Sequence, residues 1–111
     1  MMSIDDVDKI DSIGVLKDHP DMVSLAISDH LPWKKPIEQH LFKLQEKINT
    51  YIKFIDSGEI YEKFPDAKGT DKCVIEIFFK YEIPPQAICF LESVREILSS
   101  INVSLKYKII K

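Results

Sequence analysis

One amphipathic stretch, from Pro36 to Ser57, constrains the fold of this 111-residue chain more than any other. Its apolar residues recur every three or four positions: Ile37, Leu41, Leu44, Ile48, Tyr51, Ile52 and Ile55. At about 100° per residue these side chains fall on one side of a helix, so the spacing predicts a helix over 36–57 with that face on a core. Pro36 suits the first helical position, and Gly58 suits the left-handed residue that ends many helices.

Alternating apolar and polar residues predict strands on both sides of this helix. We expect four strands, over residues 10–16, 22–28, 72–81 and 103–110. The turn-forming residues 17–21 join the first two strands in a predicted hairpin. Pro85 opens a second amphipathic helix. Its apolar stripe contains Ala87, Phe90, Leu91, Val94, Ile97, Leu98 and Ile101.

This order of elements predicts an α+β fold, a two-layer sandwich in ββαβαβ order. Because the strands alternate apolar with polar residues, we expect a mixed four-stranded sheet with both helices on one face. Crossovers on one face move a sheet in one direction, which gives the strand order 1-2-3-4 with the first strand antiparallel to the rest. Residues 1–9 are acidic and aperiodic, so we expect a mobile lead-in before a single domain over 10–111.

Composition and charge argue against several classes of protein. A formal net charge of −3 lacks the basic excess of a protein that neutralises nucleic-acid phosphates. The sequence shows no apolar run near the ~20 residues of a membrane span, and the acidic N-terminus lacks a secretory signal. Two cysteines, Cys73 and Cys89, are too few for a disulfide framework, and their apolar surroundings predict small buried side chains. We therefore expect a cytoplasmic protein that binds neither nucleic acid nor membranes.

Residues that carry chemistry form no recognisable constellation in the sequence. His19, His30 and His40 lack a close-spaced second ligand for a metal, and His40 is expected at the partly exposed flank of the central helix. Neither cysteine lies in surroundings that favour a thiolate. The three glycines are too far apart for a phosphate-binding loop. We therefore expect no catalytic residue, no metal and no cofactor, which favours a protein that is not an enzyme.

Trp33 has two interpretations. It follows a predicted strand and is framed by Pro32 and Lys34. Its ring can cover the end of the core where the chain enters the helix. Alternatively it lines a shallow pocket or partner-binding rim together with other residues flanking the central helix. The candidate binding residues are His30, Trp33, Tyr61, Phe64 and Asp66.

A second candidate surface combines one helix residue with the open face of the sheet. Phe42 projects roughly opposite the apolar stripe of the central helix. Val74, Phe78 and Ile110 fall on the uncovered side of their strands and make that side partly apolar. We treat these four residues as a candidate interface with a partner or a second copy, and scattered exposed hydrophobic residues as the alternative.

Several segments resemble a small bacterial family of unknown function. They are Ile27-Ser-Asp-His-Leu-Pro-Trp33, Leu44-Gln-Glu-Lys-Ile-Asn49, Tyr61-Glu-Lys-Phe-Pro-Asp-Ala67 and the Pro84-Pro85 break before the last helix. The resemblance extends from about Ile10 to Ile110 and brings no activity, because none is assigned to the family. Here Pro32 and the segment 34–36 replace a more acidic stretch, which argues against a binding role that depends on acidity there.

The combined interpretation is a cytoplasmic, non-enzymatic protein-interaction module of a bacterium, with a homodimer as one form of that interaction. An immunity- or antitoxin-like inhibitor is an alternative, because a small acidic domain suits the electrostatic neutralisation of a basic toxin. The third hypothesis is a small-ligand binder or enzyme with a site at Asp29–Trp33 and Tyr61–Ala67.

Overall fold

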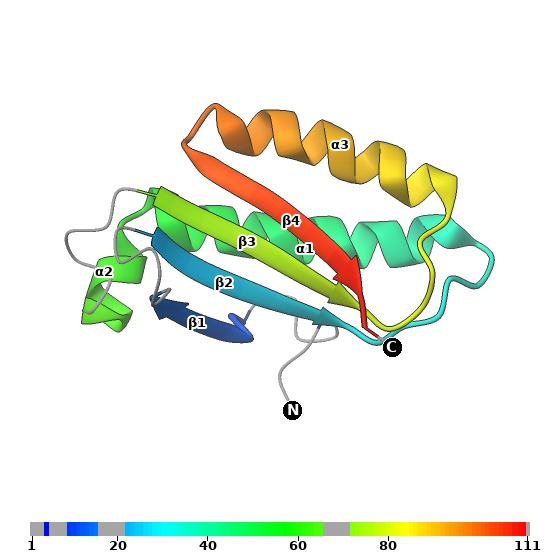
Figure 1. Cartoon of the computed structure of the whole chain (residues 1–111), viewed down its shortest axis with the longest axis horizontal. Helices are drawn as coiled ribbons and strands as arrows, with labels where there is room; N and C mark the ends of the chain where they lie inside the picture. The colour runs from blue at the N-terminus through cyan, green and yellow to red at the C-terminus, as the bar shows by residue number, and fades with distance from the viewer. Residues whose placement is uncertain (1–3, 5–8, 16–21, 66–71, 111) are drawn as a thin grey trace.

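The strands and the two long helices follow one another in the predicted ββαβαβ order, with a short additional helix directly after the first long one (Figure 1). The structure is a computed structural model, and it describes residues 4, 9–15, 22–65 and 72–110. Its elements are β1 (Ser12–Val15), β2 (Met22–Asp29), α1 (Ile37–Asp56), α2 (Glu59–Lys63), β3 (Lys72–Phe79), α3 (Pro85–Ser99) and β4 (Val103–Ile109). The short helix α2 follows Gly58, whose positive φ of 81° is the left-handed conformation expected of it.

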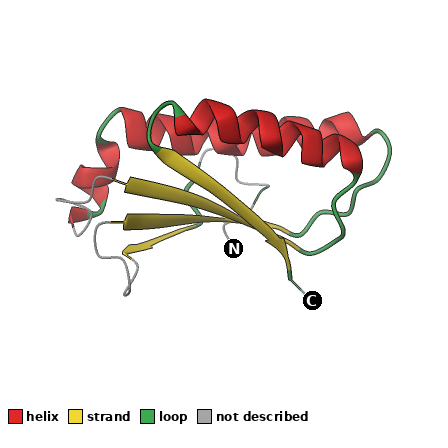
Figure 2. Ribbon diagram, turned by 45° about the horizontal axis from the view of Figure 1, so that its top comes forward, coloured by secondary structure: helices red, strands yellow, loops and turns green. Residues whose placement is uncertain are grey.

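The four strands form one mixed sheet in the order β1-β2-β3-β4, which confirms the prediction. β1 is antiparallel to β2, and β2, β3 and β4 are parallel to one another. The register aligns Leu25, Ile75 and Leu105 in one row across the sheet. Figure 2 shows α1 and α3 on the same face of the sheet, so the molecule has the two layers that the sequence predicts.

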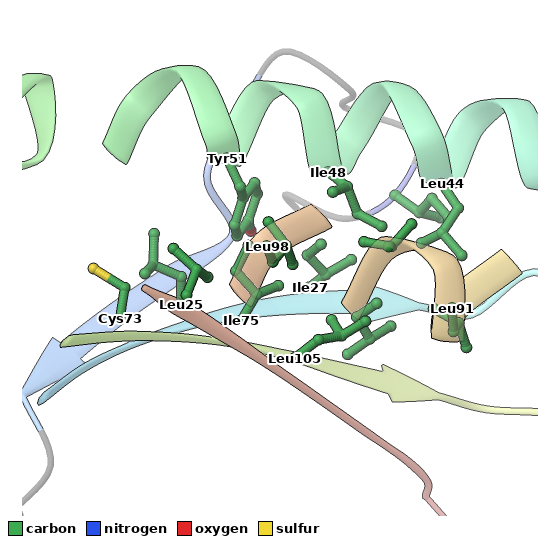
Figure 3. Close-up of a cluster of buried hydrophobic side chains, with 14 of the residues drawn as sticks. Leu25, Ile27, Leu44, Ile48, Tyr51, Cys73, Ile75, Leu91, Leu98 and Leu105 are labelled. Carbon is green, nitrogen blue, oxygen red and sulfur yellow. The ribbon is translucent and has the colours of Figure 1, made fainter. Parts of the chain in front are cut away.

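The core lies between these two layers. Figure 3 shows Leu44, Ile48 and Tyr51 of α1 pointing towards the sheet. From α3, the buried side chains are Ala87, Leu91, Val94 and Leu98, and the strands add Val23, Leu25, Ile27, Cys73, Ile75, Ile77, Phe79, Val103 and Leu105. Parallel strands and a single layer of helices therefore enclose one hydrophobic core.

The buried face of α1 differs from the predicted stripe. Its outer members are half-buried, while His40 and Lys47 are buried, contrary to the expectation that His40 is partly exposed. The buried face of α1 therefore includes the side chains of His40 and Lys47. Each can be buried because it contacts a carboxylate, Asp29 and Asp11 respectively. The half-buried members are Ile37, Leu41, Ile52 and Ile55.

Two predictions for α3 and the cysteines also need correction. Ile97 is 61 % exposed and Cys89 is exposed, because the buried side of α3 is set by Ala87, Leu91, Val94 and Leu98. Cys73 is buried as predicted, and burial raises the pKa of its thiol because the thiolate would lose hydration. Cys89 is therefore a surface residue.

β1 is short, so part of the neighbouring edge of β2 has no strand beside it. The pairing of β1 begins at Ser12, opposite Ala26. At this end of the pairing the hydroxyl of Tyr51 donates to the Ala26 carbonyl and accepts from the Asp11 N–H (2.9 Å). The Asp11 carboxylate accepts from the Ser28 N–H (3.0 Å). Side chains thus complete the edge of β2 where backbone pairing stops.

Lys47 completes the same group of interactions from α1. Its Nζ lies 2.6 Å from Asp11 Oδ1 and donates to the Lys9 carbonyl at 2.7 Å. Both side chains of the Lys47–Asp11 pair are buried. Asp11, Lys47 and Tyr51, called the edge cluster below, therefore place a buried ion pair beside a buried phenol.

Ile4 extends the same edge further. It lies within residues 1–9, where the sequence predicts a mobile lead-in, yet its side chain is fully buried in the core. Its N–H donates to the Ser28 carbonyl at 3.0 Å. Ile4 therefore supplies both an apolar side chain and a backbone donor that β1 is too short to provide, and most of the other residues of the predicted lead-in lie outside the described residues.

The opposite edge of the sheet is capped by a guanidinium group. Ile110 donates its N–H to the Phe79 carbonyl of β3, so alternation along β4 turns the Leu105 carbonyl towards the free edge. Arg95 of α3 donates to that carbonyl from Nε (3.4 Å) and a terminal nitrogen (3.3 Å). Its guanidinium also lies over the Tyr107 ring, 5.5 Å from the centroid.

Two neighbouring apolar residues of α3 test the position of the core. Leu91→Ala should lower the free energy of unfolding by about 2–5 kcal/mol, because it leaves a cavity between the layers. Ile88→Ala is the matched control on the exposed side of the same helix and should cost less than about 1 kcal/mol. Urea denaturation measures both, and equal losses would contradict the arrangement of α3.

The pKa of Tyr51 gives a second test. Burial, reinforced by the nearby Asp11 charge, raises the pKa of its phenol well above the ordinary value of about 10. The folded state therefore holds this proton more tightly than the unfolded state, so the stabilisation is complete below about pH 10 and is lost as the pH rises towards the folded pKa. The free energy of unfolding should fall by up to about 1.4 kcal/mol per pH unit from this group.

Tyr51→Phe separates this contribution from other alkaline titrations. The variant should be less stable at neutral pH by about 1–3 kcal/mol, because it leaves the Ala26 carbonyl without its donor. Its stability should nevertheless fall less steeply than that of the wild type between about pH 9.5 and 11, in urea denaturation at each pH. Parallel alkaline slopes for the two proteins would contradict the raised pKa.

Candidate functional site

The residues grouped as one candidate pocket lie at opposite ends of α1. Trp33 precedes the helix, whereas Tyr61 and Phe64 follow it, in and just after α2 (Figure 1). A 20-residue helix is about 30 Å long, so these side chains cannot line one site. Tyr61 and Phe64 are half-buried and pack against the core, and His30 is exposed. Asp66, the last member of the group, lies outside the described residues.

Asp29 and His40 are the residues that meet beside Trp33. Asp29 is the last residue of β2 and faces the core. Its Oδ2 lies 2.6 Å from His40 Nε2, and its Oδ1 accepts from the Leu31 N–H at 3.1 Å. Both side chains are buried, so the carboxylate meets its partner where little water competes. The pair joins the end of β2 to the first turn of α1.

Trp33 covers this pair. Its ring stacks on the His40 imidazole with centroids 3.6 Å apart and planes 18° apart. It also contacts Phe79 at the end of β3, with a centroid distance of 6.0 Å. Trp33 is half-buried and packs against the core, as the interpretation of its ring as a cover for the end of the core predicts. It also contributes to the Asp29–His40 site.

Two buried nitrogen atoms of this site have no hydrogen-bond partner in the described part of the chain. They are His40 Nδ1 and Trp33 Nε1. Buried polar atoms are nearly always paired in proteins, because an unpaired one loses its hydration without compensation. The hydrogen bonding of this site, unlike that of the edge cluster, is therefore incomplete among the described residues.

A small hollow adjoins the site where the loop after β2 meets α1. Its volume is about 180 Å³, and its polar lining is formed by Lys34, Lys35, Gln39, His40 and Lys43. Leu31, Pro32 and Pro36 supply the apolar part, and the described lining contains no carboxylate. We call it the N-terminal hollow. Pro36 precedes α1 as its N-cap instead of opening the helix, and it provides no side-chain cap.

The alternation of β2 carried a signal for this site. Val23, Leu25 and Ile27 face the core, and the next residue of that series is Asp29. A carboxylate on the buried side of a strand requires a cationic or hydrogen-bonding partner. The partner is His40, which the spacing of apolar residues along α1 does not identify.

The candidate interface residues differ widely in exposure. Phe42 is 62 % exposed, as the helical spacing predicts, and Ile110 is also exposed. Phe78 is half-buried, and the Lys108 ammonium lies 5.0 Å from its ring centroid. Val74 lies on the inner strand β3 between Ser24 and Ser104 and is only 3 % exposed, so it is not a surface contact.

An apolar groove between α1 and α3 was not anticipated from the sequence. Its volume is about 220 Å³. It is lined by Gln45, Ile48, Asn49 and Ile52 of α1 and by Phe90, Ser93, Val94 and Ile97 of α3. We call it the helix groove. It lies on the outer side of the helix layer, where the predicted stripe of α3 is left partly uncovered.

The described residues contain neither a metal-binding cluster nor a helix that could cross a membrane. The ranges 9–15, 22–65 and 72–110, with Ile4, contain no group of three or more His, Cys, Asp or Glu side chains placed to hold a metal ion. Within the same residues, each helix is too short or too polar to cross a bilayer.

Comparison with known proteins places the chain in a family without assigning an activity. A model of a family of unknown function, DUF6572, matches residues 2–111, and the chain belongs to this family. This confirms the resemblance to a family of unknown function. The search of curated proteins and the search of solved structures returned no match.

Double-mutant cycles test whether Asp29 and His40 act as a buried pair. Asp29→Asn, His40→Gln and the double variant should reveal a coupling energy of about 1–3 kcal/mol in urea denaturation, because either single change leaves a buried group without its partner. The exposed Glu92–Arg95 pair of α3 is the matched reference and should couple by less than about 1 kcal/mol. A buried pair that couples no more than the exposed one would contradict the geometry.

Proposed function

We propose that this chain is a protein-interaction module that pairs with a second copy of itself through α1 and the helix groove. The supporting observation is the combination of an apolar groove with two large exposed side chains on the same helix layer. Phe42 of α1 and Ile97 of α3 each expose more than half of their surface. Exposed hydrophobic side chains that gather beside a groove are typical of a binding surface.

Charge favours a second copy as the occupant. The polar residues that line the helix groove, Gln45, Asn49 and Ser93, are all uncharged. Two copies of an acidic chain with net charge −3 can therefore meet there without placing like charges opposite each other.

The spacing of residues along α1 fits a two-fold axis. If two copies of α1 pack antiparallel about a point next to Gln45, Phe42 lies one turn to one side of the axis, level with Asn49 of the second copy. Asn49 lines the helix groove, so each Phe42 reaches the groove of the other copy. The same axis places exposed Glu38 level with exposed Lys53 of the second copy, which are opposite charges.

We further propose that this association occurs in the cytoplasm. Both cysteines are free thiols, which suits a reducing compartment.

Oligomeric state in solution tests the proposal. Size-exclusion chromatography with light scattering should show a dimer that dissociates on dilution. Phe42→Asp should weaken it at least tenfold, because a carboxylate would have to be buried in the groove. Ile110→Asp places the same carboxylate at another exposed apolar side chain, outside the groove, and should leave the dimer intact.

Charge reversal tests the two-fold axis itself. Glu38→Lys and Lys53→Glu should each weaken the dimer, whereas the double variant should restore it by exchanging the two charges. A wild-type chain that remains monomeric at high concentration would overturn the proposal. A dimer disrupted by Ile110→Asp and not by Phe42→Asp would assign the contact to the open sheet face instead.

A further inference from the structure

The N-terminal hollow combines positive charge with a helix terminus. Lys34 and Lys35 lie on the loop that forms one side of it. The first N–H groups of α1 lie at the positive end of the helix dipole, and the N-cap Pro36 offers them no side-chain acceptor. Helix N-termini with nearby cations are frequent sites for anions.

His40 supplies an independent observation that points to a ligand. Its side chain is more than nine-tenths buried, and it lines the hollow. Its Nε2 is committed to Asp29, while its Nδ1 has no partner among the described residues. A group bound in the hollow is a candidate for the missing partner, because buried polar atoms are nearly always paired.

The charges around His40 determine what that group is. When Nε2–H donates to the Asp29 carboxylate, a protonated imidazole presents Nδ1–H as a second donor. The imidazolium and Asp29 then neutralise each other, so the net positive charge of the loop comes from Lys34 and Lys35. An acceptor that carries negative charge satisfies the unpaired donor and both ammonium groups.

We propose that the N-terminal hollow binds the oxyanion group, phosphate or carboxylate, of a small molecule. In this assignment His40 Nδ1–H donates to an oxygen of that group, Lys34 and Lys35 provide the charge, and the Gln39 amide is a further donor within the lining. Asp29 is a positioning residue, because it orients the imidazole and does not itself line the hollow.

The size of the hollow limits the ligand. Sites for drug-sized molecules usually have volumes of about 300–1,000 Å³. A volume of about 180 Å³ admits an oxyanion and a short attached chain, while the rest of a larger molecule would extend into solvent. The site does not depend on the helix groove, because the residues of the two lie on different flanks of α1.

Inorganic phosphate is the first probe, and the His40 imidazole is the reporter. In ¹⁵N NMR spectra of the imidazole side chains, millimolar phosphate should shift the His40 resonances in a saturable way, while those of exposed His30 move little. The single tryptophan, Trp33, stacks on His40, so its fluorescence should change with the same midpoint. A parallel titration with acetate shows whether the pocket prefers the tetrahedral or the planar oxyanion.

Matched charge variants separate specific binding from general attraction. Lys34 and Lys35 are both exposed, and replacing both with alanine should weaken phosphate binding roughly tenfold or more, because two charge-assisted contacts are lost. Lys63→Ala with Lys106→Ala removes the same charge from exposed positions outside the hollow and outside the proposed dimer contact, and should leave the affinity within about twofold.

Three results would overturn the assignment. They are a linear, non-saturating response of His40 to both phosphate and acetate, equal weakening by the two double variants, or shifts at His30 as large as those at His40. Because Lys34 and Lys35 are exposed, a two-dimensional amide spectrum should show that their replacement leaves the fold intact. Saturable binding of either anion that requires these lysines supports the site and identifies its preferred oxyanion.

Discussion

The arrangement of this protein depends on polar bonds from α1 to β2 and to the residues just before β1. His40, Lys47 and Tyr51 lie on the side of α1 that faces this strand and its flank. Each meets a group that cannot be paired within the sheet, either a carboxylate or a backbone carbonyl. Hydrophobic burial provides the main driving force for folding, but it is non-directional. The polar bonds are directional, and they fix where α1 lies along the strand.

The two ends of this polar contact differ in how fully their atoms are paired. In the edge cluster, the hydroxyl of Tyr51 and the ammonium of Lys47 have partners within the protein. At the other end, Asp29 has partners, but nitrogen atoms of His40 and Trp33 do not. A fully paired cluster stabilises a structure, whereas unpaired buried atoms beside a hollow indicate a position where a further molecule can bind.

The sequence predicted the fold well because hydrophobic periodicity is a local property. Alternation in the strands and three- to four-residue spacing in the helices were sufficient for the element order, the strand order and the single helix layer. It failed where the position of a side chain is decided by a distant partner. His40 and Lys47 look like flanking polar residues of α1, and their burial follows only from the carboxylates of Asp29 and Asp11.

The candidate site could be predicted only in part for the same reason. The sequence singles out Trp33 and leaves it two interpretations, as cover for the end of the core or as part of a binding rim, and in the structure its ring stacks on His40 beside the Asp29–His40 pair. Tyr61 was grouped with it because both flank the central helix in sequence, yet the length of α1 separates them. Asp29 was the available signal, since the alternation of β2 turns its charge towards the core.

Side chains occupy the part of the β2 edge that β1 leaves uncovered and one carbonyl on the free edge of β4, which bears on how the protein can assemble. Open strand edges are templates on which other chains, including misfolded copies, can add a strand. Here Asp11 and Tyr51 occupy edge groups of β2, and the Arg95 guanidinium occupies an edge carbonyl of β4. An incoming strand would first have to displace these contacts. The same side chains that complete the domain therefore obstruct the addition of a further strand at these positions.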